Sequence, residues 1–191
     1  KLDKSCLFRG IDPMRIGVLD AHLANQIAAG EVIERPASVA KELLENSIDA
    51  GSTRISMDLR GGGIESLRIS DNGCGIPRDE LELAFRRFAT SKVSDSIDLD
   101  SIGTLGFRGE ALPSIGAVST VTLASCTREQ KFGSAINVIE GIIGGKTDHS
   151  VSNGTTVTVQ NLFKNVPARL KFLRSEVTET SRIHNILTRY A

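Results

Sequence analysis

A chain of 191 residues with 40% apolar side chains suits one globular domain, because a chain of this length buries roughly 70% of its unfolded surface. Lys and Arg together number 23, as do Asp and Glu, so no strong net field draws the chain to nucleic acid. With seven Phe, one Tyr and no Trp, the sequence argues against an aromatic platform for stacking single-stranded bases.

Targeting and cysteine signals point to an intracellular, reducing location. Cys6, Cys74 and Cys126 lie far apart and form no C-x-x-C pair, which argues against zinc and against a disulfide framework. The longest apolar runs fall far short of the roughly 18 residues that span a bilayer, so no membrane partner is expected. The stretch "KLDKSCLFRGIDP" has no apolar segment of a signal peptide; residues 1–13 are read as an arm, disordered or foreign to the natural protein, with Met14 as the natural start.

Two helices are predicted first along the chain. Asp20 can cap a helix through "AHLANQIAAG", and Gly30 would end it. The inner face of this helix would consist of Leu23, Ala24, Ile27 and Ala28. Pro36 suits the first position of a second helix, from about residue 37 to 49, with Gly51 just past its end. Its inner stripe would be Val39, Ala40, Leu43, Leu44 and Ser47.

The pattern then changes to strands. "TRISMDL" and "ESLRISD" alternate with a period of two and are joined by three glycines, which predicts a hairpin. "RDELELAFRRFA" predicts a helix, and "EALPSIGAV" a shorter one. Between them, residues 90–106 are polar and rich in glycine, which is typical of a lid or binding loop.

The remaining segments complete the predicted fold. "STVTLASC", "SAINVIEG" and "TTVTVQNL" are rich in β-branched residues and predict three more strands, and "PARLKFL" and "ETSRIHNILTRYA" predict closing helices. About five strands and five or six helices, segregated rather than alternating, favour an α+β two-layer sandwich. We expect a mixed, mostly antiparallel sheet with helices on one face.

The second predicted helix carries an unusual polar face. Glu42, Glu45, Asn46 and Asp49 recur at spacings of three and four, so all four project on the same side. A solvated face is one interpretation; a site for a cation and a water molecule is the other. Asn46 favours the second interpretation, because asparagine is a poor mid-helix residue that gains nothing from facing solvent.

Two glycine motifs resemble nucleotide loops without fitting them. "GIIGGKT" has Glu140 where a Walker A loop needs its first glycine, and no helix is predicted after it, so we interpret it as a hairpin turn. "GCGIPR" has Arg78 in place of the third glycine of a dinucleotide fingerprint and lacks the β-α-β context.

Two other glycine motifs fit a nucleotide better. In "DNGCGIP", Asp71 ends a strand beside Gly73 and Gly75, so a flat ring could approach bare backbone and donate an exocyclic amine to the carboxylate. A simple D-N-G turn is the alternative. In "GTLGFRGEA", glycines precede a predicted helix start, where free amides and Arg108 suit phosphate; a flexible loop is the alternative.

Taken together, these motifs resemble those of the GHKL ATPases, the superfamily of gyrase-type topoisomerases, heat-shock chaperones, histidine kinases and MutL. The order is Glu42-x-x-x-Asn46, then Asp71-x-Gly73-x-Gly75, then "GFRGEAL", then Gly154-Thr155. "GFRGEAL" is similar to the hallmark of the MutL mismatch-repair family, with which "RRFATSK" and "VPARLKFL" also agree. The resemblance covers residues 14–191.

The resemblance implies a Bergerat-type ATP site and assigns its residues. Glu42 would be the general base that activates water, Asn46 would hold Mg²⁺ through its amide oxygen, and Asp71 would accept the adenine amine. The remaining ATP-binding positions would be Gly73 and Gly75 at the adenine, Thr155 supporting Asp71, Thr90, Ser91 and Lys92 at the lid hinge, and Gly106, Phe107, Arg108 and Gly109 at the phosphates. ATP and Mg²⁺ are therefore the expected cofactors.

The resemblance also implies a division of labour beyond this chain. In the family, a second domain supplies a lysine to the γ-phosphate and a C-terminal domain dimerises; both are expected to lie outside residues 14–191, so hydrolysis by this chain alone would be weak or nil. ATP would order the lid and join two N-terminal domains into a clamp on DNA that coordinates mismatch-recognition and downstream repair proteins. Such a protein would be cytoplasmic and nucleoid-associated in bacteria, or nuclear in eukaryotes.

Alternative functions share the same ATP fold. A nucleotide-gated binding module would bind ATP without turnover, and a histidine-kinase catalytic domain would pass phosphate to a partner histidine. Glu42 argues against the kinase, which needs no water-activating carboxylate, and "GFRGEAL" argues against a gyrase-like enzyme. A basic cluster near "VPARLKFL" is either a solvated face or a non-specific DNA contact, and consists of Lys164, Arg169, Lys171 and Arg174.

Overall fold

A computed structural model describes residues 17–92, 105–106 and 109–190 of the chain. The helices are α1 (Ala21–Val32), α2 (Pro36–Asp49), α3 (Ala111–Ala117), α4 (Pro167–Leu170) and α5 (Glu176–Tyr190), with short 3-10 turns η2 (Gly61–Gly63) and η3 (Leu83–Phe85). The strands are β1 (Ile55–Arg60), β2 (Ser66–Asp71), β3 (Thr120–Cys126), β4 (Gly133–Ile139), β5 (Ile142–His149) and β6 (Gly154–Gln160). Most of the predicted lid and the arm at residues 1–13 lie outside the described residues.

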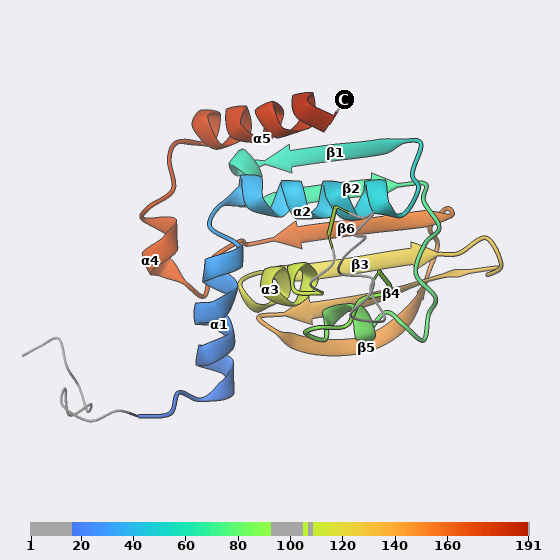
Figure 1. The fold of residues 1–191 in the computed structure, drawn as a ribbon, viewed down its shortest axis with the longest axis horizontal. Coiled ribbons are helices and arrows are strands. Elements are labelled where there is room, and N and C mark those ends of the chain that lie inside the picture. Colours follow the sequence, from blue (N-terminus) through green and yellow to red (C-terminus); the bar gives the residue numbers. More distant parts are fainter. Residues whose placement is uncertain (1–16, 93–104, 107–108, 191) are drawn as a thin grey trace, which may run out of the picture.

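The strands form one antiparallel sheet in the order β1-β2-β6-β3-β4-β5 (Figure 1). β6 lies between β2 and β3, so the last strand of the chain closes the middle of the sheet. Its register sets Ser70 opposite Thr156 on β2 and Ser125 opposite Thr155 on β3. The C-terminal ends of β2 and β3 and the start of β6 therefore lie side by side at one end of the central strands, where Asp71 lies.

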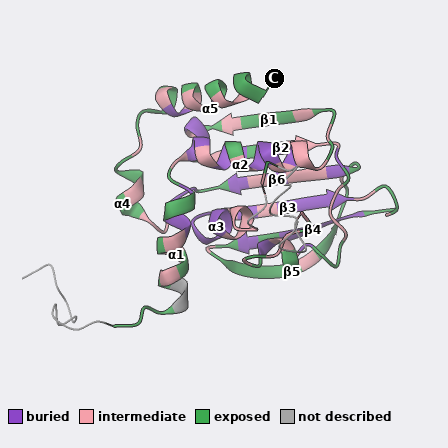
Figure 2. Cartoon of the chain, in the orientation of Figure 1, coloured by how far each residue is buried: buried purple, intermediate pink, exposed green. Residues whose placement is uncertain are grey.

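Helices cover one face of this sheet, which confirms the predicted two-layer architecture. In Figure 1, α2 lies in front of β2 and β6, and α3 in front of β3 and β4. α1 packs against α3, and α5 packs against α2 and the η2 turn. Buried residues concentrate between the layers (Figure 2) and include Leu43 of α2, Ile69 of β2, Ile115 of α3, Leu123 of β3 and Val159 of β6. Among the described helices, none is long and apolar enough to cross a membrane.

α2 forms as the sequence predicts. Pro36 occupies its first turn, the inner stripe is buried along its whole length, and Gly51 follows it with φ +71°. Because only glycine adopts that left-handed conformation without strain, Gly51 ends the helix and turns the chain toward β1. The hairpin of β1 and β2 also forms as predicted, with Leu59 opposite Leu67.

α1 differs from the prediction in its end and in its buried face. Asp20 does cap the helix, accepting a hydrogen bond of 3.2 Å from the amide of Leu23. The helix continues through Gly30, however, and buries Ala29, while Leu23 and Ile27 are exposed. Gly30 lies under the Arg169 side chain: a Cβ there would come within 2.5 Å of the guanidinium, so that side chain would have to shift.

β5 corrects the interpretation of "GIIGGKT" as a turn. The turn of this hairpin is at Glu140 and Gly141, both with positive φ, and the glycine-rich stretch after it is an eight-residue strand. The sequence pattern missed this sixth strand because β5 is an edge strand with almost every residue exposed, so it has no buried alternation. The rejection of a Walker A loop holds, since a strand and no helix follows the glycines.

The predicted helix in "RDELELAFRRFA" is wrong. Residues 77–89 form successive turns with only a short 3-10 segment, η3, because most of their backbone bonds span three residues. Leu81 and Phe85 are nevertheless buried, so the four-residue apolar spacing is used for packing without a continuous helix. Phe88, with φ +62°, turns the chain away from any helical continuation.

The sheet core gives a direct stability prediction. Ile69 on β2 is 1% exposed, so Ile69→Ala removes packed methyl groups and should lower the free energy of unfolding by about 2–5 kcal/mol in urea titration. Ile142→Ala on the edge strand β5 is the matched control, because Ile142 is 72% exposed and should shift stability by less than about 0.5 kcal/mol. Equal losses in the two variants would contradict the assignment of the core to the inner face.

Candidate functional site

The carboxylate of Asp71 joins three parts of the chain. Its Oδ1 accepts hydrogen bonds from the backbone amides of Gly73 (2.9 Å) and Thr155 (3.2 Å), and its Oδ2 accepts one from the Ser47 hydroxyl (3.0 Å). Ser47 belongs to α2, Gly73 to the loop after β2, and Thr155 to β6. A carboxylate has about four lone-pair directions, so after three bonds Asp71 can accept one further donor.

Glycines let the backbone close around Asp71. A Cβ at Gly154, where φ is +118°, would collide with the Asp71 carbonyl, and a Cβ at Gly75, where φ is +75°, would collide with the Cys126 carbonyl. Gly73 likewise has Ala50 and Ser52 too close for a side chain. These glycines therefore serve close backbone approach at the sheet edge, consistent with a site that a flat group could enter.

A buried serine that the sequence did not single out organises the same edge. The Ser125 hydroxyl accepts the Ile76 amide (2.8 Å), donates to the Gly154 carbonyl (2.9 Å) and lies 3.0 Å from the Thr155 hydroxyl. It thus fixes the loop of residues 72–76 against β6. Neither Ser125 nor Ser47 belongs to a recognisable motif, so only their long-range contacts identify them.

The polar face of α2 divides into structural and open groups. Glu45 is buried: its carboxylate accepts a hydrogen bond from the Tyr190 hydroxyl at the end of α5 and pairs with Lys41 Nζ at 3.2 Å. This tether holds α5 against α2. Glu45 therefore has a structural role that the regular spacing of the face did not distinguish.

Glu42, one turn earlier, is less tightly bound. Its side chain is 29% exposed and its nearest charged partner is Lys41 Nζ, at 3.7 Å. Burial, with a further contribution from the neighbouring Glu45 carboxylate, raises the pKa of Glu42 despite the opposing charge of Lys41. A carboxylate with a raised pKa is a better proton acceptor than an ordinary one.

Asn46 and Asp49 together hold a positive charge. Lys92 Nζ donates to Asn46 Oδ1 at 3.0 Å and to Asp49 Oδ2 at 2.6 Å. Asp49 also accepts the backbone amides of Leu105 (3.0 Å) and Gly106 (3.1 Å). Burial alone would raise the pKa of Asp49, but these donors outweigh it and hold that pKa below its usual value.

The oxygens at this end of α2 fit a metal ion. The Asn46 amide oxygen accepts a hydrogen bond from a cationic group, the Lys92 ammonium, so this oxygen is accessible to a positive charge. Amide and carboxylate oxygens are the ligands that Mg²⁺ prefers, and Mg²⁺ commonly takes few ligands from the protein and the rest from phosphates and water. Among the described residues no three His, Cys, Asp or Glu side chains gather into a metal site.

The predicted lid residues lie beside this cation position as far as the structure describes them. The Thr90 hydroxyl accepts the amide of Lys92 (3.1 Å), Ser91 is exposed, and a Cβ built on Gly106 would lie within 4 Å of Lys92 Nζ and Asn46 Oδ1. Gly109, with φ +61°, packs against Ala89 and accepts the Phe88 amide at 3.1 Å through its carbonyl. Phe107 and Arg108 lie outside the described residues.

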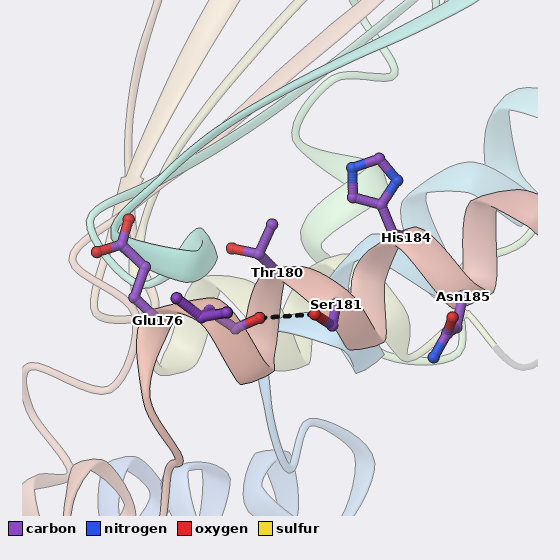
Figure 3. A pocket seen from close by; sticks show the side chains of 6 residues that line it. Glu176, Thr180, Ser181, His184 and Asn185 are labelled. Atoms are coloured by element: carbon purple, nitrogen blue, oxygen red, sulfur yellow. Dashed lines mark hydrogen bonds between the residues drawn. The ribbon is translucent and has the colours of Figure 1, made fainter.

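The predicted basic cluster does not form one open surface. Lys164, Lys171 and Arg174 are exposed, but the Arg169 guanidinium packs against Gly30 of α1. A hollow of about 460 Å³ lies elsewhere, along α5, where it is lined by Glu176, Val177, Thr180, Ser181, His184 and Asn185 (Figure 3). Its side chains project from a single helix, and none of them belongs to the Asp71 or Asn46 groups.

Most of the chain matches the sequence profile of a known protein family. The profile of the "Histidine kinase-, DNA gyrase B-, and HSP90-like ATPase" family matches residues 34–168, which include the whole of α2, Asp71 and Thr155. The match spans well over half of the chain, and the chain belongs to this family of ATPases.

Within that family the chain is similar to MutL proteins. It is 54% identical over 174 residues to the DNA mismatch repair protein MutL of Xanthomonas campestris pv. campestris (strain B100), and 54% identical over 180 residues to MutL of Haemophilus influenzae (strain ATCC 51907 / DSM 11121 / KW20 / Rd). These alignments cover 91% and 93% of this chain but only 28% of each relative, so the chain spans about a quarter of their length.

Solved structures agree with this placement. The Aquifex aeolicus MutL ATPase domain complexed with ADP is 34% identical, with a TM-score of 0.64 over 84% of this chain and 56% of that one. The N-terminal domain of a DNA repair protein is 32% identical, with a TM-score of 0.74 over 88% of this chain and 48% of that one. The expected GHKL fold is therefore confirmed.

The Ser47–Asp71 bond generates a stability prediction at the site. Ser47→Ala leaves one Asp71 oxygen without its donor and should lower the free energy of unfolding by about 1 kcal/mol, the net value of one such bond. Ser181→Ala on α5 is the control, because the Ser181 hydroxyl is exposed and donates to the carbonyl of Val177 in its own helix. Indistinguishable urea midpoints for Ser47→Ala and wild type would show that Ser47 does not support Asp71.

Proposed function

We propose that this chain is the ATP-binding and ATP-hydrolysing domain of a MutL-type DNA mismatch-repair protein. The observation that carries the proposal is that the Asn46 amide oxygen binds a positive group, the Lys92 ammonium, one helical turn from the half-buried carboxylate of Glu42. Binding of ADP by the similar Aquifex aeolicus domain supports it. The ATPase family to which the chain belongs makes hydrolysis the expected reaction.

Glu42 and Asn46 would divide the chemistry between them. Asn46 would hold Mg²⁺ through its amide oxygen, and the ion when bound would neutralise phosphate charge. Glu42 would accept a proton from the attacking water, a role for which its raised pKa suits it. Lys41 Nζ lies 3.7 Å from the Glu42 carboxylate and donates its hydrogen bond to Glu45, so Glu42 keeps its own acceptor positions for a water molecule.

Asp71 would select adenine. Three of its hydrogen-bonding positions are filled by Ser47, Gly73 and Thr155, which leaves room for one donor such as an exocyclic amine. Because an unmet buried acceptor is costly, a base lacking that amine would bind less well. Gly73 and Gly75 would let the ring lie against the backbone.

The lid residues would bind the phosphates. Thr90, Ser91 and Lys92 would form one side of the lid, and Gly106, Phe107, Arg108 and Gly109 the other, where backbone amides and a guanidinium suit phosphate. ATP would favour the ordered lid only if it binds that state better than the open one. This differential binding is what would turn the site into a switch.

We further propose roles that extend beyond the chain, on the strength of its resemblance to MutL proteins. Full activity would need a lysine from a following domain, so turnover by this chain alone would be weak. ATP would join two such domains into a dimer that contacts repair proteins and, through exposed basic residues such as Lys164 and Lys171, DNA. Because the similar MutL proteins are bacterial, we place this activity in the cytoplasm, associated with the nucleoid.

Two substitutions on α2 test the catalytic assignment. Glu42→Ala should retain binding of a non-hydrolysable ATP analogue in calorimetry while reducing phosphate release by the full-length protein ~10²–10⁴-fold, because only proton transfer is lost. Asn46→Ala should instead lose the Mg²⁺-dependent part of binding. If wild-type protein bound the analogue but released no phosphate, a nucleotide-gated module without turnover would be the better description.

Nucleotide-dependent association tests the switch. In sedimentation velocity, the full-length protein, which the resemblance implies is already dimeric through its C-terminal domain, should become more compact and sediment faster with Mg²⁺ and the ATP analogue, because its N-terminal domains join. ADP should leave those domains apart, because it lacks the γ-phosphate. Asp71→Asn should bind nucleotide more weakly and so lose this change. Identical sedimentation coefficients with ATP analogue, ADP and no nucleotide would refute the switch.

A further inference from the structure

Lys92 makes a contact that a lid-hinge role does not explain. Its ammonium lies between Asn46 Oδ1 (3.0 Å) and Asp49 Oδ2 (2.6 Å), which are the two α2 oxygens best placed to bind a cation. We propose that Lys92 is an internal counter-ion, which occupies this position in the nucleotide-free protein and is exchanged for the divalent ion when nucleotide binds. The inference rests on the proposed function and adds regulation of the same site.

The charge on Asp49 explains why a counter-ion is needed. Its side chain is 6% exposed, and an unpaired carboxylate at that depth is unfavourable. Besides Lys92 it accepts two backbone amides, from Leu105 and Gly106, which carry no net charge. Lys92 is therefore the positive group that balances Asp49 in the described structure.

The geometry also explains why the lysine and the metal exclude one another. A divalent ion bound to Asn46 Oδ1 would stand beside an ammonium 3.0 Å from the same oxygen, and two cations so close repel strongly where water is partly excluded. Lys92 can leave, because its side chain is 21% exposed and its flexible stem can carry the ammonium away from the site. Lys92 would lose its hydrogen bonds to Asn46 and Asp49 when it leaves, and the metal ion would then balance the negative charge of Asp49.

This exchange has a measurable consequence. Without metal, the Lys92 ammonium would partly replace Mg²⁺ and support nucleotide binding; with metal, its displacement would oppose binding. Lys92 therefore narrows the difference between metal-free and metal-dependent affinity. The ratio of the nucleotide association constant in Mg²⁺ to that in a chelator isolates this effect, because a plain phosphate contact would change both constants alike.

The test is calorimetry of a non-hydrolysable ATP analogue with wild type and Lys92→Met, each in Mg²⁺ and in EDTA. The ratio of association constants should rise by roughly threefold to tenfold in Lys92→Met, the range expected for one part-buried ion pair. Lys92→Arg keeps the charge and should keep the ratio within about twofold of wild type. Unfolding midpoints measured alongside identify any variant that has lost its fold, in which case Lys92→Gln replaces it.

Lys146→Met is the matched control. Lys146 is 26% exposed and pairs with Glu82 at 3.2 Å, so it resembles Lys92 in burial and pairing but lies away from Asn46. Its loss should leave the ratio unchanged. An unchanged or lower ratio in Lys92→Met, with wild-type binding intact, would overturn the counter-ion role alone. Failure of wild type to bind the analogue even in Mg²⁺ would overturn the proposed function and the inference with it.

Discussion

The hydrogen bonds to the Asp71 carboxylate are the constraint on which the rest of the site depends. They join Ser47 of α2, the loop at Gly73 and the start of β6 at Thr155, three segments that are distant in sequence. Because Ser47 follows Asn46 directly, the bond from Ser47 to Asp71 at the end of β2 also fixes where the Asn46 amide and the Glu42 carboxylate project. The Asp71 carboxylate thus sets the distance between the loop at Gly73, proposed to contact the nucleobase, and the Asn46 end of α2, proposed to contact phosphate and metal.

α2 satisfies two demands that usually conflict. Its apolar stripe packs on the sheet, and its opposite face holds charged groups close to the protein interior. The four polar residues on that face have different partners: Glu45 pairs with Tyr190 and Lys41, Asp49 and Asn46 both bind Lys92, and Glu42 has only its neighbour Lys41 as an ion-pair partner among the described residues. Most of the polar stripe therefore anchors neighbouring segments.

What the sequence could predict follows the range of the interactions involved. α2, the β1–β2 hairpin and the position of Asp71 depend on local patterns, such as Pro36 at a helix start and Gly51 at its end, and these predictions agree with the structure. β5 escaped prediction because an exposed edge strand has no hydrophobic period, and the buried face of α1 depends on its packing against α3, which is distant in sequence. The roles of Ser125 and Tyr190 depend wholly on such distant contacts.

The charges at the site show why nucleotide, metal and protein conformation should be coupled. Asp49 contacts both flanks of the predicted lid, Lys92 on one side and the amides of Leu105 and Gly106 on the other. Any cation that takes the place of Lys92 at Asn46 must therefore change the partners of Asp49. A change at Asp49 would alter its contacts with Lys92 and with the amides of Leu105 and Gly106 together. A coupling of this kind needs no long pathway, because one carboxylate, that of Asp49, both pairs with the Lys92 ammonium and accepts the backbone amides of Leu105 and Gly106.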